Sequence, residues 1–182
     1  MKDCDESNEP DPPSSGGPKR LTITLSGCPN EIQDMVRRAA RRTLSSEGRG
    51  SGQLEIAFVD AAAMSRHHER WAGRDGPTDV LAFNLLDDAL PGRVDGQLIV
   101  CESVARQEAG VRNTDWRGEL LLYVVHGCLH LCGYDDHGAE DFERMHRRED
   151  ELLSELGWES VFSWNGSSSR ADTTISPPDR ET

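Results

Sequence analysis

Three histidines fall within twelve residues of the chain, in the stretch HGCLHLCGYDDH, at positions 126, 130 and 137. On a helix, His126 and His130 lie about 40° apart on one face and one turn apart, so both imidazoles can reach one ion. Gly133 can end such a helix and turn the chain back, so that a residue shortly after it supplies a third ligand. Three protein ligands with an open fourth position are typical of catalytic zinc, which lowers the pKa of a bound water to about 7 and makes it a nucleophile.

The same stretch has three other interpretations: ordinary histidines, a structural zinc site and a peptidase. Two histidines at this spacing also occur as ordinary core or surface residues, but a buried helix, the exit glycine and the third histidine favour a metal site. Cys128 and Cys132 could belong to a structural zinc site, yet Cys128 lies about 200° around the helix from His126, so we expect both cysteines to pack as small apolar residues. Gly127 stands where zinc peptidases of the HExxH type carry their general-base glutamate, which argues against a peptidase.

The rest of the pattern predicts the elements that position these histidines. Residues 116–132 are apolar nearly all round, so we expect a central helix that bears the metal ligands. Apolar alternation and apolar runs predict strands at 21–25, 54–58, 80–86 and 98–101. Helices are expected from Asn30 to Gly48, from Asp60 to about residue 71, from near residue 103, and over 142–157, with Asn30 and Asp60 as caps. The order indicates a single α+β domain, in which a mixed sheet of about four strands packs with helices.

The tails differ from this core in composition. Residues 1–19, acidic and rich in proline, and residues 165–182 have almost no large apolar side chains, so we expect both tails to be disordered around a folded domain at 20–164. The chain has 182 residues and a net charge of −13, which argues against a protein that coats nucleic acid through a basic surface. We expect no membrane span and no secretory leader, and we expect the five cysteines to be reduced thiols of a cytoplasmic protein.

Three segments together resemble one bacterial family. HGCLHLCGYDDH resembles the HGxLHLxGYDH signature of the YbeY family, GPTDVLAF at 76–83 resembles its PTDVLSF strand, and DGQLIV at 95–100 resembles its GDIVI strand. These segments have matching order and spacing over about residues 20–160. The resemblance implies a zinc-dependent endoribonuclease specific for single strands. It further implies a role in 16S rRNA 3′-end maturation and ribosome quality control, with single-stranded RNA, 16S rRNA and the small ribosomal subunit as partners. No membrane and no DNA partner is expected, and no general acid is assigned.

The chain departs from the family pattern at two positions. The family places its third histidine three residues after the glycine, where this chain has Asp136 and the histidine follows at His137. We expect His137 to be the third ligand, because one extra loop residue costs little. Asp136 is the alternative, since carboxylates also bind zinc. Ala72 stands where the family has a functionally important arginine, and that role is not transferred to Arg74. A non-catalytic or weakly catalytic zinc protein of ribosome assembly is therefore the alternative function.

The sequence does not decide the role of two charged segments. The arginines at positions 37, 38, 41 and 42 form a basic stripe opposite the apolar face of their helix, which is either a phosphate contact or a solvated surface. Arg112 and Arg117 are candidate phosphate contacts, on the basis of their positions near the start of the motif helix alone. Residues 135–159 carry ten acidic and three basic side chains, and we expect this stretch to be a solvated helix face.

Overall fold

The computed structural model describes residues 20–86, 90–158, 174 and 175. The predicted tails, 1–19 and 165–182, therefore lie outside the described residues except for residues 174 and 175. Disorder of these tails stays a prediction. No helix in the described ranges has the length and apolarity that a membrane crossing requires.

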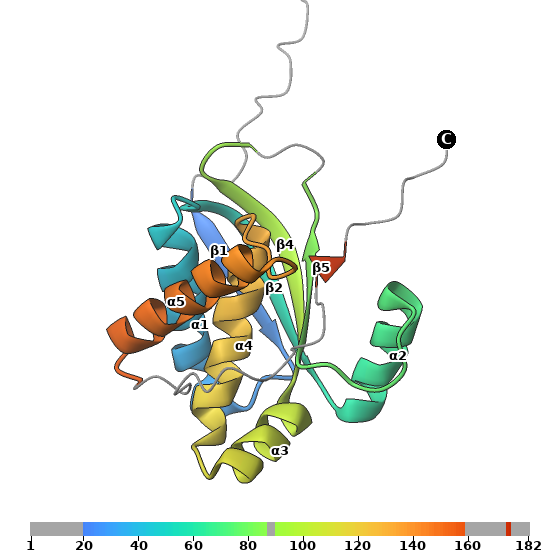
Figure 1. The fold of residues 1–182 in the computed structure, drawn as a ribbon. Helices are drawn as coiled ribbons and strands as arrows, with labels where there is room; N and C mark the ends of the chain where they lie inside the picture. Colours follow the sequence, from blue (N-terminus) through green and yellow to red (C-terminus); the bar gives the residue numbers. More distant parts are fainter. Residues whose placement is uncertain (1–19, 87–89, 159–173, 176–182) are drawn as a thin grey trace, which may run out of the picture.

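The described strands form one mixed sheet in the order β1-β2-β4-β3-β5 (Figure 1). β1 and β2 are parallel, as are β2 and β4, whereas β3 runs antiparallel to β4. The four predicted strands are all present, and the mixed α+β sheet is confirmed. β5 adds a two-residue parallel strand beside β3. The strands are β1 (Leu21–Ser26), β2 (Ser51–Val59), β3 (Val80–Asn84), β4 (Arg93–Cys101) and β5 (Thr174–Ile175).

Helices cover the two faces of the sheet unequally. α1, α4 and α5 lie over one face and α2 packs on the other, while α3 leads from the end of β4 into α4 (Figure 1). The helices are α1 (Gln33–Ser46), α2 (Ala61–Ala72), α3 (Glu102–Arg112), α4 (Trp116–Leu131) and α5 (Ala139–Glu155), and a 3-10 turn η1 (Asn30–Ile32) precedes α1.

The alternation of side chains between the two faces of the sheet explains why the central strands are continuous apolar runs in the sequence. Leu98 and Val100 point into the main core, whereas Ile99 joins Leu81 and Met64 in a second cluster under α2. Alternate residues of a strand face opposite sides of the sheet, so a strand with both faces covered is apolar throughout. Among the described residues, α2 covers the end of this face where Ile99 and Leu81 lie.

α4 is the central helix that its composition predicts, since every residue from Gly118 to Leu131 is buried. It comes closest to the sheet at Gly127. A Cβ atom at Gly127 would lie 2.8 Å from Leu98 Cδ2 and 3.2 Å from Val80 Cγ2. The absence of a side chain here lets α4 approach β3 and β4, which fixes the depth of the neighbouring histidines.

The two predicted helix caps have different outcomes. Asp60 caps α2 as predicted, because its Oδ1 accepts a hydrogen bond of 2.7 Å from the backbone N–H of Ala63. The prediction that Asn30 caps the first helix is wrong. Asn30 begins η1, and Ile32 occupies the cap position of α1 without a side-chain cap. The 3-10 turn shifts the cap position of α1 by two residues, from 30 to 32, and Asn30 Oδ1 accepts instead from Gln33 Nε2 at 3.0 Å.

Candidate metal centre

His126 and His130 form a buried pair on one face of α4. Their Nε2 atoms lie 3.0 Å apart, and the two rings meet edge to face. Only 1% of His126 and 7% of His130 is exposed. The helical spacing of four residues thus brings both imidazoles to one point, as predicted.

A different acceptor holds the other nitrogen of each ring. His126 Nδ1 lies 2.6 Å from Glu149 Oε1 of α5, and His130 Nδ1 lies 3.0 Å from the carbonyl oxygen of Tyr134. A carbonyl and an ionised carboxylate can only accept, so each Nδ1 carries the proton. Both Nε2 atoms are then acceptors that face each other. Histidines that bind a metal through Nε2 have this tautomer, in which the Nδ1–H donates to a neighbouring acceptor and so orients the ring.

This chemistry fits a divalent cation. Two acceptor nitrogens in close contact repel unless a proton or a cation lies between them. Burial, followed by the neighbouring His126, lowers the pKa of His130, which favours the neutral ring that binds metal. Asp136 lies beside the pair, and one ligand atom from each of His126, His130 and Asp136 lies within 4.8 Å of the others. Nitrogen and carboxylate donors in this number suit zinc.

The turn after α4 carries the groups that complete the centre. Gly133, at a φ of 96°, ends the helix with paired hydrogen bonds, from Gly133 N–H to His130 O and from Tyr134 N–H to Leu129 O. These two bonds define a Schellman turn, in which the left-handed residue favours glycine. The turn directs the Tyr134 carbonyl back to His130 and delivers Asp136 to the histidine pair.

The structure separates His137 from the two histidines of the predicted ligand set. The His137 side chain is 52% exposed, and its Nδ1 is hydrogen-bonded to Asp135 Oδ1. Asp136 is 6% exposed, with Oδ2 4.0 Å from His126 Nε2 and Oδ1 3.7 Å from His137 Nδ1. His137 shares a second group of potential ligands, with Asp135 and Asp136. His137 as third ligand stays a prediction, and the geometry favours its alternative, Asp136.

Glu149 is the residue of the site that sequence reasoning missed. It lies in the acidic stretch expected to be a solvated helix face, yet only 1% of it is exposed. A signal for this burial exists in the sequence. Glu149 follows Met145 by four residues and precedes Leu152 and Leu153 by three and four, so it belongs to the apolar face of α5.

The structure does not support a peptidase or a structural zinc site with cysteine ligands, the two alternatives for this motif. The position of the peptidase glutamate, Gly127, faces the sheet rather than the histidine pair, and a side chain there would meet Leu98. Cys128 belongs to the main core, and Cys132 packs against it. Neither cysteine belongs to a group of potential metal ligands within the described part of the chain. Burial raises the pKa of Cys132 to about 12, which disfavours the thiolate that zinc requires.

His68, His146 and Arg112 have partners outside the histidine pair. His68 Nδ1 contacts the Gly76 carbonyl oxygen at 2.9 Å, and His146 Nδ1 contacts the Phe142 carbonyl oxygen. Arg112 binds the buried carboxylate of Glu119 at 2.6 Å, so it joins α3 to α4.

The basic stripe of α1 is partly neutralised within the chain. Arg42 forms an ion pair of 2.8 Å with Glu155, and Arg41 donates to the Leu21 carbonyl oxygen. Arg38 is exposed. These arginines therefore offer fewer phosphate contacts than their number in the sequence indicates.

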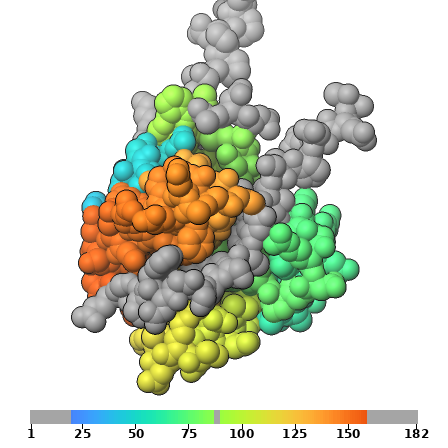
Figure 2. Space-filling model, viewed as in Figure 1, coloured from blue at the N-terminus to red at the C-terminus, as the bar shows by residue number. Residues whose placement is uncertain are grey.

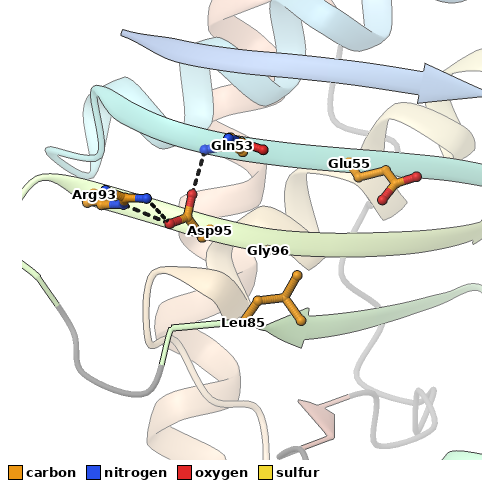
Figure 3. A pocket seen from close by; sticks show the side chains of 6 residues that line it. All are labelled: Gln53, Glu55, Leu85, Arg93, Asp95 and Gly96. Carbon is orange, nitrogen blue, oxygen red and sulfur yellow. Dashed lines mark hydrogen bonds and ion pairs between the residues drawn. The ribbon is translucent and has the colours of Figure 1, made fainter. Parts of the chain in front are cut away.

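One pocket lies on the opposite face of the sheet from the histidine pair. Its polar groups already bind one another, since Asp95 accepts from Arg93 Nε at 2.7 Å and from the backbone N–H of Gln53 at 2.9 Å (Figure 3). None of the metal-site residues belongs to it. The pocket is lined by Gln53, Glu55, Leu85, Arg93, Asp95 and Gly96.

Comparisons with known proteins agree with the order of these elements. The family model described as "Endoribonuclease YbeY" matches residues 21–157. The endoribonuclease YbeY of Acidothermus cellulolyticus is 42% identical over 115 residues, which cover 56% of this chain and 69% of that protein. The one of Chlorobium luteolum is 34% identical over 119 residues, 65% of this chain and 85% of that protein. A solution structure from Thermotoga maritima, 25% identical, covers 81% of this chain and all of that one, with a TM-score of 0.54.

Proposed function

The chain belongs to the endoribonuclease YbeY family, and from this premise we propose that it is a metal-dependent endoribonuclease. Its substrate is single-stranded RNA, its ion is zinc, and it acts in the cytoplasm. The specific role that we propose is 16S rRNA 3′-end maturation and ribosome quality control on the small subunit. The names of the relatives support the nuclease activity, and the resemblance of three sequence segments supports the finer role.

One observation supports metal-dependent hydrolysis more than any other. His126 and His130 face each other through Nε2 atoms 3.0 Å apart, while Glu149 and the Tyr134 carbonyl hold their Nδ1 atoms. When bound, zinc supplies Lewis acidity toward a phosphate oxygen and lowers the pKa of a water molecule. The chain itself supplies neutral, oriented imidazoles in a buried setting, which strengthens electrostatic interaction with the phosphate.

We propose Asp136 as the third ligand, with His137 as the alternative. Asp136 supports this assignment because its carboxylate is nearly buried beside His126. It also stands three residues after Gly133, at the family's third-ligand position. Compared with a third histidine, a carboxylate lowers the net positive charge of the centre. Zinc held by this set would acidify a bound water less than zinc held by three histidines.

The test is cleavage of a labelled single-stranded RNA that spans a 16S 3′ end. We expect zinc-loaded wild-type protein to cleave it and His130→Ala to lose at least about 100-fold in rate. The reason is that even residues which only orient metal ligands are worth 10–100-fold. His67→Ala is the matched control, because His67 lies on α2, apart from the metal centre. Equal cleavage by wild type and His130→Ala would place the activity at another site or in a contaminant.

A second candidate function has one observation in its favour. Ala72, the last residue of α2, stands where the family carries an arginine, and Arg74 follows in the exposed loop after Gly73. Without that cation, developing charge on the phosphate has less stabilisation. Zinc binding and association with the small subunit without RNA cleavage would support a weakly catalytic or non-catalytic assembly factor.

A further inference from the structure

Glu47, at the C-terminal end of α1, binds two elements of the metal centre at once. Its Oε2 accepts a hydrogen bond of 3.1 Å from the Tyr134 hydroxyl, and its Oε1 accepts one of 2.8 Å from Arg148 Nε. The Glu47 side chain is 16% exposed. Tyr134 comes from the turn after α4 and Arg148 from α5, so one carboxylate connects three elements. In Figure 2 the orange surface of α5 and the preceding turn adjoins the cyan end of α1.

Both partners of Glu47 lead directly to a histidine. Tyr134 places its own carbonyl oxygen 3.0 Å from His130 Nδ1. Arg148 is the neighbour in sequence of Glu149, whose carboxylate lies 2.6 Å from His126 Nδ1. Glu47 therefore binds the residue that orients His130 and the sequence neighbour of the residue that orients His126.

We propose that Glu47 is a positioning residue of the metal centre, because it holds Tyr134 and Arg148 together and thereby fixes the groups that orient His130 and His126. The proposal rests on the proposed metal-dependent function. Metal ligands must be held within about 0.5 Å of productive geometry by packing and outer hydrogen bonds. The Schellman turn fixes the Tyr134 backbone only from the α4 side, and Glu47 adds the contact from α1.

The charges around Glu47 suit such a role. Arg148 also pairs with Glu151 at 2.8 Å, and its side chain is about three-quarters buried, so the guanidinium has little freedom to leave Glu47. The Tyr134 hydroxyl donates its proton in a hydrogen bond to the Glu47 carboxylate. A hydrogen bond to a charged acceptor is stronger than a neutral one, which favours a single position of the turn.

The chain offers a matched control for the α1–α5 contact. Arg42 and Glu155 also join α1 to α5, through an ion pair of 2.8 Å, but both side chains are about half exposed. Neither residue has a described hydrogen bond to the turn after α4. Glu155→Ala therefore removes an α1–α5 contact and leaves the metal centre intact.

The experiment measures zinc affinity by competition with a chromophoric chelator, together with the visible spectrum of the Co²⁺-loaded full-length chain. Glu47→Ala is expected to weaken zinc about 10-fold, at the lower end of effects for residues that orient ligands, and to shift the Co²⁺ bands. Tyr134→Phe, which removes only the hydroxyl, is expected to show a smaller shift in the same direction. Glu47→Gln keeps an acceptor oxygen and is expected to restore most of the affinity. Glu155→Ala is expected to match wild type in both readouts.

Three results would overturn the proposal. Wild-type affinity and spectrum in Glu47→Ala would show that the turn is fixed without Glu47. Equal losses in Glu47→Ala and Glu155→Ala would assign the effect to general α1–α5 packing. Absence of zinc from the wild-type chain would overturn the proposed metal as well, whereas the first two results leave it standing. Tyr134→Phe and Glu47→Gln keep the proposal testable if Glu47→Ala does not fold.

Discussion

The two halves of the metal centre are built differently. His126 and His130 are buried on the central helix, and groups from two other segments, Glu149 and the Tyr134 carbonyl, hold their outer nitrogens. The residues of the following turn, 135–137, bind mainly one another, and both Asp135 and His137 are about half exposed. The helical half is thus preorganised for a cation, whereas the turn offers several donors. In the proposed metal centre, the rigid helix therefore sets the position of the ion, and the turn sets its third ligand and net charge.

The largest effect that tests this comparison concerns the third ligand. Asp136→Ala is expected to weaken zinc about 100-fold, because it removes the carboxylate that forms a group of potential metal ligands with His126 and His130. His137→Ala is expected to change the affinity less than about 3-fold, because the side chain is about half exposed and its Nδ1 is hydrogen-bonded to Asp135 at the surface. Zinc content and a chelator competition give both values.

The reverse pattern would restore the assignment expected from the sequence. Loss of zinc in His137→Ala alone would mean that the turn rearranges when the ion binds. Equal losses in both variants would indicate that Asp136 and His137 both bind the ion. Asp135→Asn is the control for charge, because it alters the turn without removing either donor.

The sequence predicts the helical half of the centre well, for a physical reason. A helix has one geometry, so a spacing of four residues is enough to place two histidines on one face. The turn has no such constraint, because the backbone angles after Gly133 decide whether Asp136 or His137 reaches the pair. The same limit explains Glu149 and Glu47. Their roles depend on how α5 and α1 pack against α4, which local patterns do not encode, although the position of Glu149 among apolar residues of α5 indicates its burial.

The close approach of α4 to the sheet at Gly127 can be tested separately from the metal ligands, through its effect on stability. Gly127→Ala is expected to lower the free energy of unfolding by about 2 kcal/mol, because the new Cβ would lie 2.8 Å from Leu98 Cδ2. Gly110→Ala on α3 is the matched control, since its Cβ would meet nothing within 4 Å. That variant is expected to be stabilised by about 0.5–1 kcal/mol. Chemical denaturation measures both, and equal stability of the two variants would contradict the close approach of α4 to the sheet.

The smallest effect concerns Glu149, which distinguishes orientation of a ligand from ligation itself. Glu149→Gln keeps the size of the side chain and an acceptor oxygen for His126 Nδ1, but removes the negative charge. We expect zinc affinity to fall about 10-fold, because a carboxylate makes the imidazole a more basic ligand than an amide does. Glu143→Gln makes the same charge change at an exposed position of α5 and is expected to match wild type.

The size of this loss relative to that of Asp136→Ala tests the comparison of the two halves. A loss in Glu149→Gln as large as in Asp136→Ala would mean that His126 depends on the Glu149 charge for its position, so the helical half is no more preorganised than the turn. An unchanged affinity would mean that α4 alone holds His126 and that Glu149 is buried for packing with α5. The expected result is a loss of zinc affinity in Glu149→Gln about one-tenth as large as that in Asp136→Ala, with a normal unfolding midpoint for the zinc-free protein. This result follows only if the helix positions the His126 ring and the Glu149 carboxylate raises its basicity.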